Sequence, residues 1–135
     1  MYRKPSVQVS VYEYVSPFGR GLDPGNRWIR LSDTIPWDDI EASYAAHFRR
    51  GGAPAKPSRF AFGALLIQKI LNTSDVETVA QITENPYLQY FIGIREFQTN
   101  PPFNPSLMSI FRKRIDNVTV RKIMSETQPV FAGRK

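Results

Sequence analysis

The chain has 135 residues, a formal net charge of +6, 41% hydrophobic residues and no cysteine. This length and apolar content allow one domain with a packed core and exclude a chain that is disordered throughout. The lack of cysteine excludes disulfides, thiolate metal ligands and cysteine nucleophiles. There is no signal-peptide pattern, and the longest apolar-rich run, Phe60 to Leu71, is shorter than the about 20 residues that span a bilayer. We therefore expect a soluble cytoplasmic protein with no membrane partner.

Residues 1–30 are expected to form an extended N-terminal arm. Val7, Val9 and Val11 alternate with polar or aromatic residues. This period of two residues is typical of a β-strand. Since a lone strand has no ladder partner, it would lie against the core, be shared between subunits or form a mobile tail.

Two helices are predicted before residue 73. The first runs from Pro36, which suits a first helical turn, to about Arg50. The second runs from about Ser58 to Asn72 and is apolar on nearly every side, which is typical of a helix at the centre of a bundle. Gly63 in its interior costs about 1 kcal/mol relative to alanine, and a close helix crossing at that point would explain it.

Two shorter helices are predicted next. Ser74 and Glu77 form a capping box that opens a helix to about Glu84. Its expected inward residues are Val76, Val79, Ala80 and Ile82. Pro86 starts a further helical segment, which contains the aromatic block Tyr87 to Ile92. Such a stripe is more often core than a platform for stacking bases, so we expect it to pack on the second helix.

The stretch from Asn104 to Ile115 predicts a short amphipathic helix with a basic face. Its expected apolar face comprises Leu107, Met108, Phe111 and Ile115. Hydroxyls and cations fall on the opposite arc, at a spacing that a DNA major groove could accept, although a merely solvated face has the same pattern. The expected contacts with double-stranded DNA are Ser106, Ser109, Arg112, Lys113 and the flanking Arg114, with Lys56 and Arg59 as adjacent phosphate contacts.

Basic residues gather towards the C-terminus, after this helix as well as on it. From Pro101 to Lys135 only Asp116 and Glu126 oppose them. The basic residues of this region are Arg112, Lys113, Arg114, Arg121, Lys122, Arg134 and Lys135. Clustered positive charge favours a polyanion, nucleic acid before anionic lipid. A last short helix is expected from Thr119 to about Thr127, followed by a basic tail.

Together these elements predict an all-α fold, a compact bundle of four to six short helices with a helix-turn-helix-like arrangement. We divide the chain into an arm at 1–30, a helical DNA-binding domain at 31–116, and a short helix with a basic tail at 117–135, the start of a linker. The motifs of phosphate loops, zincins, EF-hands and zinc ribbons are absent from the sequence, and His47 is the only histidine. We therefore expect no catalytic residue, metal site or cofactor in this chain.

Several ordered blocks of the sequence resemble the N-terminal domain of bacterial insertion-sequence transposases of the DDE type. The resemblance covers Gly19 to Ile115, and its most distinctive block runs from Glu84 to Gly93. The other blocks are Leu22 to Leu31, Ile35 to Asp38, Pro54 to Arg59, Gly63 to Leu65, Ser74 to Val79, Pro101 to Leu107 and Phe111 to Arg114. Ala53 departs from the family, which usually carries arginine there, and the match fades after Asp116.

The resemblance implies a domain that recognises the terminal inverted repeats of an insertion sequence during DNA transposition. In the family, strand transfer takes place in a following RNase H-like domain, where three carboxylates hold divalent metal, implying Mg²⁺ there. None of the acidic residues in this chain maps onto that triad, so we expect an excised domain or a truncated product that is no enzyme alone. Its expected location is the bacterial cytoplasm, in association with the nucleoid.

Two alternatives stay open at this stage. The aromatic block and the Val7 to Val11 strand could make the chain an interaction or oligomerisation module that pairs with itself or with a full-length transposase. A truncated copy would then inhibit transposition. The helix from Ser74 to Glu84 is the second choice for entering a groove, although Asp75, Glu77 and Glu84 would repel phosphate.

Overall fold

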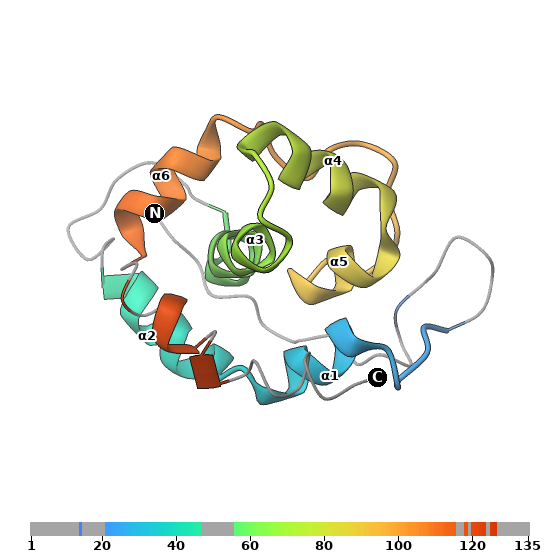
Figure 1. Cartoon of the computed structure of the whole chain (residues 1–135), viewed down its shortest axis with the longest axis horizontal. Helices are drawn as coiled ribbons and strands as arrows, with labels where there is room; N and C mark the ends of the chain where they lie inside the picture. Colours follow the sequence, from blue (N-terminus) through green and yellow to red (C-terminus); the bar gives the residue numbers. More distant parts are fainter. Residues whose placement is uncertain are drawn as a thin grey trace.

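The computed structural model describes residues 14, 21–46, 56–115, 118, 120–123 and 125–126. The labelled helices in these ranges are α1 (Arg27–Thr34), α2 (Trp37–Ala46), α3 (Ser58–Leu71), α4 (Asp75–Glu84), α5 (Pro86–Phe91) and α6 (Leu107–Arg114). The described residues at 118, 120–123 and 125–126 are helical as well. The other helices surround α3 (Figure 1). This arrangement confirms the predicted all-α bundle. None of the helices in the described ranges is long and apolar enough to cross a membrane.

Helix α3 is the central element of the core. Every residue from Ala61 to Ile67 is buried, and α2, α4 and α6 all pack on this helix. A Cβ atom on Gly63 would lie 2.9 Å from Cγ2 and 3.4 Å from Cα of Ile92, the residue that follows α5. The predicted close approach at Gly63 is therefore present, and α3 needs glycine there because the backbone at Ile92 fills the space.

Helix α1 corrects the expectation that residues 1–30 are extended. The Asn26 side chain caps this helix by accepting a hydrogen bond from the Trp28 amide at 2.8 Å. Trp28 and Leu31 are buried, and the Trp28 ring lies edge-on to Phe91 at 5.4 Å. The segment is helical because the cap and the apolar spacing agree, and the expected boundary after residue 30 divides a helix.

In the N-terminal segment that was expected to form an arm, Tyr14 is the one residue before residue 21 that the structure describes. Its side chain is 3% exposed and its ring meets Tyr90 edge-on at 6.0 Å. At this point the segment lies against the core, as one of the three expectations for the arm proposed. The Val7 to Val11 strand lies outside the described residues.

Helix α4 has the predicted cap but a different buried face. The Glu77 amide donates to Ser74 Oγ at 3.0 Å, as the capping box predicts. Val76, however, is 68% exposed. Thr78 is buried instead, because its hydroxyl donates to the Ser74 carbonyl at 2.7 Å and so needs no water. The expectation that Val76 points inward is therefore wrong, while Val79 is buried as predicted.

The aromatic block at the end of α5 belongs to the core, as predicted. Leu88, Phe91 and Ile92 are buried, and Phe91 stacks edge-on with Trp37 of α2 at 5.6 Å. Helices α4 and α5 meet at Asn85, whose side chain accepts from the Tyr87 amide at 2.8 Å. Residues 92–106 then separate α5 from α6, so the basic helix does not follow its neighbour through a short turn.

Candidate nucleic-acid interface

Helix α6 is anchored through the apolar face that its sequence predicts. Met108, Phe111 and Ile115 are buried, and Leu107 is half-buried. The Phe111 ring packs edge-on against Phe103 at 5.1 Å. This face packs on α3, so the opposite arc of α6 is turned outwards.

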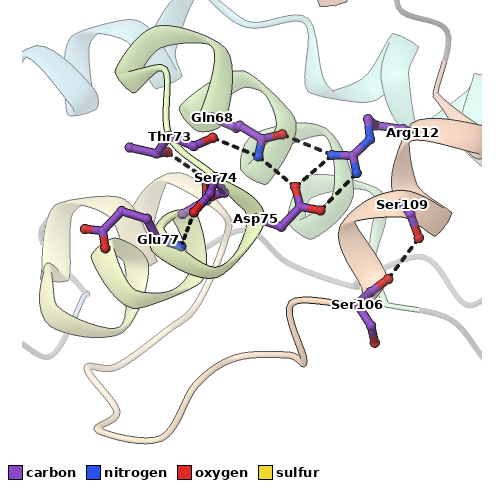
Figure 2. Close-up of polar contacts among 9 residues, drawn as sticks. Gln68, Thr73, Ser74, Asp75, Glu77, Ser106, Ser109 and Arg112 are labelled. Atoms are coloured by element: carbon purple, nitrogen blue, oxygen red, sulfur yellow. Dashed lines mark hydrogen bonds and ion pairs between the residues drawn. The ribbon is translucent and has the colours of Figure 1, made fainter.

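Three of the predicted DNA contacts form one exposed row on α6. Ser106, Ser109 and Lys113 are all exposed. At 100° per residue they lie within an arc of about 60°. Ser109 Oγ donates to the Ser106 carbonyl at 3.1 Å, which leaves the oxygen free to accept (Figure 2). The row therefore offers two hydroxyls and one ammonium group to a ligand outside the bundle.

Arg112, the next predicted contact, is held in a clasp by two other helices (Figure 2). Its Nη1 donates to Asp75 Oδ1 at 2.9 Å and to Gln68 Oε1 at 3.2 Å, and its Nη2 donates to Asp75 Oδ2 at 3.0 Å. The hydrogen bond from Arg112, followed by one from Gln68, lowers the pKa of Asp75. Asp75 in turn raises the pKa of Arg112. The ion pair therefore fixes the guanidinium without removing it from the surface.

Two further predicted cations lie against the bundle. Burial raises the pKa of Tyr44 on α2, and the nearby Arg114 side chain acts in the opposite direction. Arg114 therefore lies next to α2 as well as at the end of α6. The ammonium group of Lys56 lies 5.8 Å from the centre of the Phe60 ring, and this side chain is half-buried. Lys56 thus keeps part of its surface for a flanking contact.

Arg59 is placed in the core, which corrects its expected role as a phosphate contact. It is 8% exposed. Its Nε donates to the Phe91 carbonyl at 2.8 Å, and its Nη2 donates to Ser32 Oγ at 2.9 Å and the Tyr90 carbonyl at 3.2 Å. The guanidinium carbon lies 4.3 Å from the centre of the Trp37 ring. Burial lowers the pKa of Arg59 to about 10, so it stays charged at neutral pH while it joins α1, α2, α3 and α5.

Asp75 and Gln68 are the site residues that the sequence reasoning missed. Asp75 was expected to repel phosphate, and Gln68 is a polar residue in a helix that is otherwise mostly apolar. That exception was the available signal, since a polar side chain inside a core helix needs a hydrogen-bond partner. Within the described ranges, no group of three or more His, Asp or Glu side chains is arranged to hold a metal ion.

Comparison with known proteins shows the family of this chain. Residues 17–114 match the family described as Transposase domain (DUF772). The chain belongs to this transposase-domain family, because the match covers well over half of its length. A protein of Rhizobium meliloti named "Uncharacterized protein ORF8 in nfe locus" is 34% identical over 94 residues, 70% of this chain and 45% of that protein. The chain therefore spans less than half the length of this curated relative. No solved structure matches the chain.

Proposed function

We propose that this chain is the DNA-binding domain of a transposase and recognises the terminal inverted repeats of an insertion sequence during DNA transposition. The observation that carries the proposal is the exposed row of Ser106, Ser109 and Lys113 on a helix whose other face is anchored in the core. Membership of a transposase-domain family supports a role in transposition. The net charge of +6 supports a polyanionic partner.

The dimensions of α6 suit a DNA groove. An α-helix with its side chains is about 10–12 Å in diameter, and the major groove of B-DNA is about 12 Å wide, so the groove can admit α6. In this proposal the hydroxyls of Ser106 and Ser109 contact phosphates or base edges, and Lys113 contacts a phosphate. Lys56 adds a flanking phosphate contact. Phosphate contacts fix the orientation of such a domain on the duplex, while base contacts supply its sequence preference.

The chemistry of strand transfer belongs, in this proposal, to another part of the transposase. The matched relative is more than twice as long as the segment that this chain resembles. A separate RNase H-like domain would hold Mg²⁺ with three carboxylates, and the present chain would bring that domain to the element ends. The bound species is double-stranded DNA, in the bacterial nucleoid.

The proposal is tested by selection of duplexes from a randomised pool with the full chain, followed by titration of the selected duplex and a scrambled duplex at two salt concentrations. We expect the selected sequence to bind at least about 10³-fold more tightly than the scrambled one. Lys113→Gln should weaken binding to both. The matched control is Arg30→Gln, which removes one exposed charge from α1, on a different side of α3 (Figure 1).

Two outcomes would contradict the proposal. Equal and steeply salt-dependent binding to both duplexes would leave a basic domain without sequence recognition. Absence of binding together with a mass that rises with protein concentration would favour the interaction module, with a second copy or a full-length transposase as partner. Most of the aromatic block is buried, so α5 offers little of the surface that this alternative expects.

A further inference from the structure

The guanidinium of Arg112 has one edge that its protein contacts leave open. Arginine has five N–H donors. Nη1 directs its two hydrogens to Asp75 Oδ1 and Gln68 Oε1, and Nη2 directs one hydrogen to Asp75 Oδ2. In the described part of the chain no acceptor takes Nε–H or the second hydrogen of Nη2. Because the group is planar, these two hydrogens point in parallel from the same edge.

This edge is held in place by a chain of hydrogen bonds across three helices (Figure 2). Gln68 of α3 donates through Nε2 to Asp75 Oδ1 at 2.8 Å and to the Thr73 carbonyl at 3.0 Å. Asp75, at the start of α4, then accepts hydrogen bonds from both Nη1 and Nη2 of Arg112 on α6. The side chains of Arg112 and Asp75 are 37% and 35% exposed, so the clasp is partly open to solvent.

Charge and geometry together select the chemical class of the ligand. The carboxylate of Asp75 balances the guanidinium, so the clasp carries no net formal charge and attracts an isolated phosphate less than a free arginine would. Two parallel donors still match two acceptors that lie side by side. O6 and N7 of guanine form such a pair in the major groove, and bidentate arginine is their commonest partner. Fixing the fork beforehand reduces the entropy lost on binding.

We propose that Arg112 reads one guanine through O6 and N7, using Nε–H and the open hydrogen of Nη2, with Asp75 and Gln68 as positioning residues. This inference rests on the proposed DNA-binding function and assigns its sequence preference to one side chain. The row of Ser106, Ser109 and Lys113 then orients the duplex, while the clasp discriminates between bases.

The test uses the full chain and the duplex selected by the wild-type protein. Each guanine is replaced in turn by 7-deazaguanine, which lacks N7, and each phosphate in turn by an uncharged methylphosphonate. At one guanine we expect 7-deazaguanine to weaken wild-type binding roughly tenfold or more. Arg112→Lys should remove this penalty, because lysine lacks the planar fork. Asp75→Asn should reduce it, while far-ultraviolet circular dichroism shows both variants folded.

Control variants separate base reading from loss of charge or of structure. Lys113→Gln should weaken binding to every duplex and keep the 7-deazaguanine penalty, and Arg30→Gln should change neither quantity. The inference is overturned if Arg112→Lys keeps the full penalty of 7-deazaguanine. It is overturned as well if Arg112→Lys removes the penalty of a methylphosphonate instead of the penalty of a modified guanine. It is also overturned if Asp75→Asn binds more tightly with an unchanged penalty, since Asp75 would then merely compete with DNA.

The same experiment distinguishes failure of this inference from failure of the proposed function. A chain that selects no sequence at all contradicts both. If the chain selects a sequence but Arg112→Lys removes the 7-deazaguanine penalty at none of its guanines, only the proposed role of Arg112 is contradicted.

Discussion

Replacing Arg59 by alanine should destabilise the fold strongly, because its guanidinium is a structural junction rather than a surface cation. It makes three hydrogen bonds, two of them to the carbonyls of Tyr90 and Phe91, and lies 4.3 Å from the centre of the Trp37 ring. A phosphate contact on the surface would behave differently. Its removal would weaken DNA binding and change the free energy of unfolding by less than about 0.5 kcal/mol.

The magnitude follows from what the truncation leaves behind. Each hydrogen bond from a charged donor contributes about 1.5–3 kcal/mol, and a desolvated cation–π contact contributes about 2 kcal/mol. The cost of burying the charge, several kcal/mol, offsets much of this sum. After truncation, however, the two carbonyls lose their buried donor. We therefore expect Arg59→Ala to lower the free energy of unfolding by about 2–6 kcal/mol, because each buried carbonyl left without a donor costs about 1–3 kcal/mol.

The assay is urea unfolding followed by the fluorescence of the two tryptophans, one of which contacts Arg59. Since small domains have only about 5–15 kcal/mol of stability, Arg59→Lys provides a milder second variant. Lysine keeps the charge but cannot reproduce the fork, so this variant should lose about 1–3 kcal/mol. Arg30→Ala is the matched control and should unfold like the wild type. A stability of Arg59→Ala within about 0.5 kcal/mol of the wild type would refute the structural role.

Three further changes test other parts of the structure. Gly63→Val should cost at least about 2 kcal/mol of unfolding free energy, because a Cβ atom would lie 2.9 Å from the buried Ile92; unchanged urea midpoints would contradict this close approach. Val76→Ala should be neutral within about 0.5 kcal/mol while Val79→Ala costs about 1 kcal/mol or more, and equal losses would show that the buried face of α4 is misassigned. The folded state depresses the pKa of Asp75, so the stability that it contributes is present above about pH 4 and is lost as the pH falls through the folded value. The pair is partly exposed, so the loss should be small, and Asp75→Asn should lack it when unfolding is measured across that range.

The fold was largely predictable where local signals agreed with the tertiary contacts. Helix α3 ends as predicted, with Asn72 in the left-handed conformation at φ 57°. Helix α4 begins at its capping box, and Gly93 ends the α5 segment at φ +94°. Helix α1 was missed because eight residues without a proline start or an acidic first turn give a weak helix signal. Its formation depends on packing against α5, which no local pattern reports.

The candidate site was predicted in outline but not in the use of each cation. Helical periodicity placed Ser109 and Lys113 on the exposed arc and Phe111 in the core, because that arc depends only on spacing along one helix. Whether an arginine is buried, paired or free to bind a ligand depends instead on which residues from other helices lie next to it. Arg59 meets carbonyls from α5, and Arg112 meets a carboxylate from α4, and neither partner is near in sequence.

Several contacts orient α6, and some of its cations make these contacts. A change in DNA binding must therefore be interpreted differently for each cation that is replaced. Phe111 anchors the helix in the core, Arg112 ties it to α4, and Arg114 interacts with Tyr44 of α2. Loss of DNA binding after replacement of Arg112 or Arg114 could therefore reflect a rotated helix as well as a missing contact. Lys113 is exposed, so its replacement reports on the ligand with little disturbance of the helix. A defect in the Lys113 variant together with a base-specific defect in the Arg112 variant would show that one anchored helix both holds the duplex and reads its sequence.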